Sequence, residues 1–134
     1  MAQNVPYNLE AEQAILGCVL IENEIMTALS DEMKVQDFYD RRHQIIFSAM
    51  LNICKSQVQI DFTTLIAELQ TKNQLIEAGG AVYLSSLIDA VYTTANISDY
   101  IQIVQDAALK RNVIAAATSI AEAGYNANYD SAGY

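Results

Sequence analysis

Apolar side chains recur at helical spacing along most of the chain, and this pattern predicts an all-helical protein. Asn8 is placed to cap the first helix and Asp61 the fourth, while Gly79-Gly80 breaks the chain before the fifth. We expect five helices in the first part of the chain: residues 9–22, 24–29, 40–55, a helix that follows Asp61, and a helix from Gly79-Gly80 to about residue 93.

The segment from Ala95 to Ala123 contains no Gly or Pro, and Gly124 then stands where a C-terminal helix cap is expected. Its apolar residues fall on two stripes: Ile97, Tyr100, Ile101, Val104 and Ala108, then Val113, Ile114, Ala117 and Ile120. Such wide apolar coverage favours a helix that projects and packs on something else. A single core helix that breaks near Lys110 and folds back is the alternative.

These patterns give an all-α fold in three parts. Residues 1–94 are predicted to form a compact helical bundle of about five helices, and residues 95–124 a long helix. Residues 125–134, which are small, polar and rich in tyrosine, are predicted to be a loop or a disordered tail.

The charge of the chain argues against nucleic acid as its main partner. The net charge is −9, from 16 acidic and 7 basic residues, so the domain should repel a duplex. The basic cluster Arg41, Arg42 and His43 is interpreted as a solvated helix start. An acidic module more plausibly binds a basic or mixed protein surface. A nucleic-acid-binding helical module remains the alternative function.

The sequence offers no pattern for catalysis. A phosphate loop is absent, so the chain should not hydrolyse ATP alone. The single His43 is interpreted as a cap or core-edge histidine, and the acidic pairs Glu10/Glu12 and Glu22/Glu24 as solvated faces. We therefore predict no catalytic, cofactor-binding or metal-binding residue in this chain.

The two cysteines, Cys18 and Cys54, each lie in an apolar helical run, as reduced core residues of a cytoplasmic protein do. The first seven residues do not resemble a signal peptide. No apolar run reaches the length of about 18 residues that a membrane span requires. We expect a cytoplasmic protein that does not enter a membrane.

Six strings, taken together and in order, resemble the N-terminal domain of the DnaB-type bacterial replicative DNA helicases. They are NLEAEQAILGCVL (residues 8–20), DFYDRRHQIIFSAM (37–50), IDFTTLIAEL (60–69), GGAVYLSSL (79–87), TTANISDYIQIVQDAALKR (93–111) and IAEAG (120–124). Each string is weak alone, but their order and spacing are specific. The resemblance covers about residues 5–125.

The resemblance implies a fold and a set of partners. The family's domain is a helical bundle followed by a helical hairpin, and the long helix predicted here resembles the first hairpin arm. Six subunits form a ring, and their N-terminal domains pair into a collar. The collar docks the C-terminal domain of primase and communicates with helicase loaders. The motor domain, which uses ATP and Mg, lies further along the family's chain and is absent here, as are the linker and the second arm.

The resemblance also implies a partner-binding site. The family's primase contacts fall on the hairpin and the nearby bundle, and the matching positions are Tyr83, Ile114 and Ile120. Val113 and Ala117 lie on the same stripe as the two isoleucines. Each position has a structural alternative, since Tyr83 could be an ordinary core residue and Ile114 and Ile120 could pack against a neighbouring hairpin.

Overall fold

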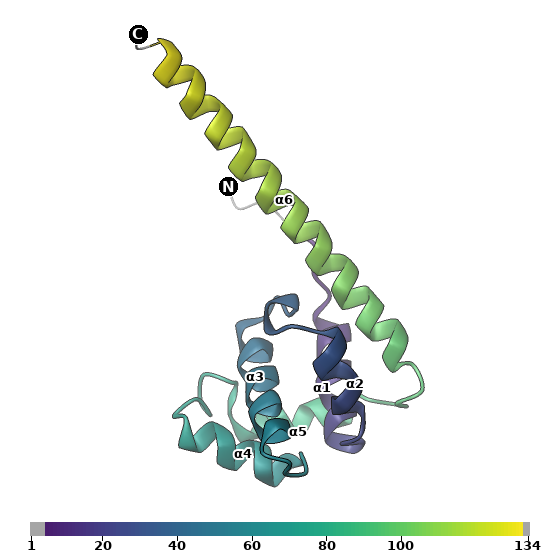
Figure 1. Ribbon diagram of the computed structural model, residues 1–134. Coiled ribbons are helices and arrows are strands. Elements are labelled where there is room, and N and C mark those ends of the chain that lie inside the picture. The colour runs from purple at the N-terminus through teal and green to yellow at the C-terminus, as the bar shows by residue number, and fades with distance from the viewer. Residues whose placement is uncertain (1–4, 133–134) are drawn as a thin grey trace.

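The computed structural model describes residues 5–132, and it describes side chains as far as Asn126. Within that range the chain forms six α-helices and one short 3-10 helix, without a strand. Figure 1 shows the first five α-helices gathered into a bundle, from which the sixth extends as a single rod. The elements are α1 (Leu9–Ile21), α2 (Ile25–Glu32), η1 (Val35–Asp37), α3 (Arg41–Lys55), α4 (Phe62–Thr71), α5 (Gly80–Asp89) and α6 (Ile97–Ala132).

Helix α1 lies at the centre of the bundle, where it packs against α3, α5 and α6. Its apolar residues surround the whole helix instead of forming one stripe, as expected for a helix covered on all sides. Gly17 allows the backbone of α5 to come close, because a Cβ at this position would lie 2.2 Å from the carbonyl oxygen of Leu87.

The predicted helix starts are confirmed. The Asn8 side chain accepts a hydrogen bond from the Ala11 backbone N–H, at 2.9 Å, and Asp61 accepts one from the Thr64 N–H, at 2.8 Å. Both contacts satisfy backbone donors that the first turn of a helix leaves without partners. Gly79 and Gly80 both have positive φ angles, of 109° and 83°, so this pair forms the tight turn that begins α5.

The long helix α6 begins on the bundle and ends far from it. Its first part packs against α1 and η1, where Ile101, Val104 and Ala108 are buried. After Ala108 no side chain as far as Asn126 is buried. Because α6 continues without a break through Lys110, the projecting arrangement is confirmed and the folded-back alternative is wrong. We call residues 109–126 the arm.

The predicted end of this helix at Gly124 is wrong, because α6 continues to Ala132. A glycine inside a helix costs about 1 kcal/mol relative to alanine, and that cost alone does not end a helix with good helix formers around it. Gly124 also lacks the positive φ angle of a glycine cap. Residues 125–132 are therefore helical, and the rest of the predicted tail, residues 133–134, lies outside the described residues. Of the helices that the structure describes, none is both long enough and apolar enough to cross a bilayer.

Candidate partner-binding site

The arm carries an exposed row of apolar side chains. Val113, Ala117 and Ile120 follow one another at intervals of four and three residues, so they lie on one face of α6, and Ile114 lies beside them. The exposed fractions are 60% for Val113, 37% for Ile114 and 72% for Ile120. Leu109, one turn before Val113, is also exposed and extends the same row towards the bundle. We call these five residues the arm face.

The part of the arm after Arg111 is almost uncharged. Between Asn112 and Asn126 the only charged residue is Glu122, and many of the residues around the arm face are small, among them four alanines, Thr118 and Ser119. Small side chains allow another helix to approach closely, and the absence of charge removes the penalty for burying ionised groups. The arm face is therefore suited to packing against an apolar helix or groove.

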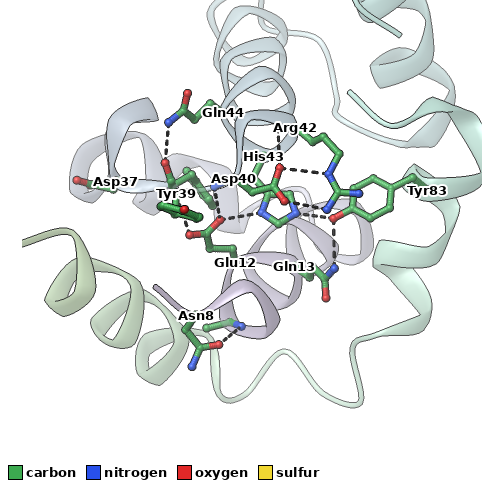
Figure 2. A network of polar contacts seen from close by, with 12 residues as sticks. Asn8, Glu12, Gln13, Asp37, Tyr39, Asp40, Arg42, His43, Gln44 and Tyr83 are labelled. Carbon is green, nitrogen blue, oxygen red and sulfur yellow. Dashed lines mark hydrogen bonds and ion pairs between the residues drawn. The ribbon is translucent and has the colours of Figure 1, made fainter. Parts of the chain in front are cut away.

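Tyr83 lies on α5 in the bundle, and its hydroxyl points inward (Figure 2). The hydroxyl accepts a hydrogen bond from Gln13 Nε2 at 3.2 Å and lies 2.5 Å from His43 Nε2. Burial raises the pKa of the Tyr83 phenol, and the hydrogen bond from Gln13 opposes that effect. The Arg42 guanidinium covers the ring at 4.1 Å from its centroid. Tyr83 is a half-buried part of the bundle.

Glu12 and His43 form the centre of this polar network, with exposed fractions of 1% and 0%. The Glu12 carboxylate lies 2.8 Å from His43 Nδ1 and accepts hydrogen bonds from the backbone N–H groups of Tyr39, at 2.8 Å, and Asp40, at 3.3 Å. Because the carboxylate oxygens act as acceptors, Nδ1 carries the hydrogen in this contact. In the Nδ1–H tautomer, Nε2 is the ring atom that can accept the Tyr83 hydroxyl hydrogen. Each buried side-chain nitrogen and oxygen of this network therefore has a hydrogen-bond partner.

These contacts correct two expectations. Glu12 was predicted to lie on a solvated face and His43 at a cap or core edge, but both are buried. A buried carboxylate is tolerated here because it receives three hydrogen bonds, two of them from backbone groups just before α3. The residues at positions 10 and 12 point in different directions on α1, so Glu10 remains exposed while Glu12 faces α3.

The basic cluster at the start of α3 is also only partly solvated. Arg41 is exposed, but Arg42 donates to both carboxylate oxygens of Asp40, at 3.1 and 2.8 Å. The Arg42 hydrogen bond is the main cause that holds the pKa of Asp40 below its ordinary value. Asp40 also caps α3 by accepting from the Arg42 backbone N–H at 2.8 Å. With one arginine engaged in this way, the cluster is not an open phosphate-binding surface.

The five residues predicted for partner binding do not form one patch. Val113, Ile114, Ala117 and Ile120 lie together on the arm, whereas Tyr83 lies in the bundle on α5, towards the other end of the molecule (Figure 1). Sequence reasoning missed Leu109, although its spacing of four residues from Val113 could have indicated it. It also missed the Glu12–His43 contact, for which the sequence contains no signal.

The described residues hold no group of three or more His, Cys, Asp or Glu side chains that could bind a metal ion. Cys18 is buried and Cys54 half-buried, and both are free thiols. Burial, with a smaller contribution from the nearby Glu22 carboxylate, raises the pKa of the Cys18 thiol. A raised pKa disfavours the reactive thiolate, so Cys18 acts as a small core residue.

Comparison with known proteins agrees with the geometry. Residues 4–106 match the family model described as the DnaB-like helicase N terminal domain. The chain is 43% identical over 120 residues to the replicative DNA helicase DnaB of Geobacillus stearothermophilus, a match that covers 90% of this chain and 26% of that protein. The chain thus spans about a quarter of the length of this curated relative.

Two solved structures share the fold. The N-terminal domain of DnaB helicase from Mycobacterium tuberculosis superposes with a TM-score of 0.90 at 34% identity, covering 93% of this chain and 89% of that one. A DnaB-like replicative helicase, solved with its interactions with primase, superposes with a TM-score of 0.76 at 29% identity, covering 86% of this chain and 27% of that one. The all-α prediction and the predicted family are both confirmed, and the chain belongs to the DnaB-like helicase N-terminal domain family.

Proposed function

We propose that this chain is the assembly and primase-docking module of a bacterial replicative DNA helicase. The helicase activity belongs to the longer parent protein, whose separate motor domain binds ATP and Mg. The domain itself contributes binding surfaces and works in the cytoplasm. The family match supports the proposal. The chain also spans only 26% of the length of its relative from Geobacillus stearothermophilus, as expected for one domain of a longer helicase.

The exposed arm face is the observation that carries this proposal. In the folded chain Val113 and Ile120 are more than half exposed. They lie on the part of α6 where every described side chain after Arg111 is exposed. Covering one such side chain stabilises a complex by roughly 1.5–3 kcal/mol. Apolar residues in a row of this kind mark a surface that another polypeptide covers.

Two kinds of polypeptide are proposed to cover the arm face and the bundle near it. One is another helicase subunit, whose own arm would pack against this one as the collar of a homo-oligomeric ring assembles. The other is the C-terminal domain of primase, in keeping with the DnaB-like helicase that was solved with its interactions with primase. The acidic bundle, with a net charge of −9 on the chain, favours partners with basic surfaces, and a helicase loader is a further candidate.

Asparagine substitutions on the arm face test the proposal. We expect Ile114→Asn and Ile120→Asn each to weaken binding of the primase C-terminal domain about 10-fold or more, because one buried apolar side chain contributes roughly 1.5–3 kcal/mol. Isothermal titration calorimetry measures the affinity, and sedimentation velocity measures self-association. Circular dichroism should show an intact bundle, because neither residue contributes to the core.

Ile76→Asn is the control, because Ile76 is an exposed isoleucine away from the arm, in the loop between α4 and α5. It should leave both binding and self-association unchanged. If the Ile114→Asn and Ile120→Asn variants bind primase and self-associate like the unsubstituted chain, the arm face is not the partner-binding site.

A further inference from the structure

A set of contacts holds α6 at the point where the arm leaves the bundle. Arg111 donates one hydrogen bond from Nη1 to the Pro6 carbonyl oxygen and one from Nη2 to the Asp37 carbonyl oxygen, both at 2.9 Å. Its guanidinium also lies 5.5 Å from the centroid of the Tyr39 ring. Tyr39 in turn stacks on Tyr7, with ring centroids 4.3 Å apart and an interplanar angle of 6°. We call these five residues the brace.

The brace joins three segments that are distant in the sequence. Pro6 and Tyr7 belong to the N-terminal segment, which runs beside α6 before α1 begins (Figure 1). Asp37 ends η1, and Tyr39 lies between η1 and α3. Arg111 reaches both segments because a guanidinium presents several N–H donors in a fixed plane, which a lysine ammonium cannot reproduce. The brace is anchored to the core as well, since the Tyr39 backbone N–H donates to the buried Glu12.

The position of Arg111 along α6 gives the brace its importance. Among the side chains of α6 described as far as Asn126, Ala108 is the last buried one, and Arg111, one turn further on, is half-buried. Every side chain after it as far as Asn126 is exposed. Arg111 follows Ile101, Val104 and Ala108 at intervals of three, four and three residues, so it continues the buried row on the same side of α6 and is the last side chain, as far as Asn126, that is not exposed.

We propose that Arg111 is a positioning residue that fixes the direction of the arm relative to the bundle. The buried row holds α6 as far as Ala108, and the brace extends this attachment by one turn to Arg111, which restricts the tilt of the helix further. The direction of the arm decides how the arm face meets a partner, and this consequence rests on the proposed function. The positional claim itself depends only on the contacts within this chain.

The size of the effect follows from the length of the helix. Residue 120 lies about 18 Å along the axis from Ala108, at a rise of 1.5 Å per residue. A tilt of about 10° at Ala108 moves residue 120 by about 3 Å, and it moves the far end of the arm further. A displacement of this size is comparable to half a helical turn, enough to misalign side chains that interdigitate across a helix pair.

Double electron–electron resonance can measure the direction of the arm. One spin label is placed at Gln70→Cys on α4 and the other at Ser119→Cys on the arm, both exposed positions. Cys54 is replaced by alanine, and Cys18 is fully buried and does not take the label. All samples also carry Ile120→Asn, so that pairing between arms does not restrain the helix. The measurement therefore holds whether or not the proposed function is correct.

We expect Arg111→Ala to shift the distance distribution, or to broaden it, by about 3 Å or more. Arg111→Lys should behave similarly, because a lysine cannot bond both carbonyl oxygens. Lys110→Ala is the matched control, since Lys110 is the neighbouring cation and its ion pair, at 3.1 Å to Asp106, lies within α6. It should leave the distribution unchanged. Tyr7→Ala removes the stack without altering α6 and should also broaden the distribution.

The proposal is overturned if Arg111→Ala and Tyr7→Ala both give the parent distribution, or if Lys110→Ala broadens it as much as Arg111→Ala does. Thermal unfolding is followed in parallel. If Arg111→Ala does not fold, Tyr7→Ala alone decides the question by the same criterion. A broadened distribution together with unchanged primase affinity in the protein without Ile120→Asn would retain the brace and refute its proposed consequence for binding.

Discussion

Replacing Glu12 by glutamine changes one oxygen into an amide nitrogen at the centre of the bundle without changing the size of the side chain. The parent carboxylate faces three donors: His43 Nδ1, the Tyr39 N–H and the Asp40 N–H. Glutamine has one acceptor oxygen. If that oxygen faces His43 and Asp40, the amide nitrogen takes the position of the oxygen that now accepts from the Tyr39 N–H at 2.8 Å. Two hydrogen-bond donors then face each other.

The cost of Glu12→Gln follows from this mismatch. Leaving one buried backbone N–H without an acceptor costs about 1–3 kcal/mol. Reversing the amide and the histidine tautomer moves the loss to the longer Asp40 contact, of 3.3 Å, but leaves the Tyr83 hydroxyl hydrogen without its acceptor on His43. Both arrangements lose at least one buried bond, so we expect a destabilisation of about 2 kcal/mol. For a domain of this size that corresponds to a fall in Tm of about 7 °C.

Urea unfolding followed by circular dichroism measures the free energy of unfolding, and Glu10→Gln is the matched control. Glu10 lies on the same first turn of α1, but it is exposed, so its replacement removes only a favourable interaction with the helix dipole, about 0.3–1 kcal/mol. If the two variants differ by less than about 0.5 kcal/mol, Glu12 does not act as the buried acceptor that the geometry indicates, and the reasoning fails.

Two further predictions concern the packing of α1 and the start of α3. Gly17→Ala should destabilise the fold by about 1–3 kcal/mol in urea unfolding, because its Cβ would meet the Leu87 carbonyl oxygen at 2.2 Å; Gly124→Ala, whose Cβ meets nothing within 4 Å, should be neutral or stabilising. The lowered pKa of Asp40 contributes stability above the unfolded pKa of about 4, which is lost as the pH falls through the folded pKa. Asp40→Asn keeps a capping side chain, so it should flatten the fall in the free energy of unfolding below pH 4; an equally steep fall would contradict this role.

The sequence predicted those parts of the fold that depend on local periodicity. The apolar residues of α6 form two stripes. One stripe, with Ile101, Val104 and Ala108, packs on the bundle, and the other lies on the arm, so the spacing of the apolar residues separated the two parts of the helix. Asn8 and Asp61 were predictable as caps because capping involves only the next few residues. The length of α6 was underestimated because Gly124 is permissive and does not by itself end a helix.

Contacts between distant segments were not predictable in this way. Glu12 and His43 are 31 positions apart, and nothing in either helix alone shows that the carboxylate faces inward. The same holds for Arg111, whose two acceptors are backbone carbonyl oxygens that any sequence carries. Backbone groups leave no mark on composition or periodicity, so a buried polar network that uses them appears only once the fold has brought the segments together.

The stability of the bundle and the proposed binding surface of the arm depend on separate parts of the chain. Polar groups such as Glu12 and His43 are buried and fully bonded inside the bundle, whereas apolar groups such as Val113 and Ile120 stay in water on the arm. The fold gains little from Val113 and Ile120, so replacing either residue can alter the proposed partner binding at little cost to stability. The brace at Arg111 lies on the boundary between the two parts, and it is where a change in the bundle can alter the direction of the arm face.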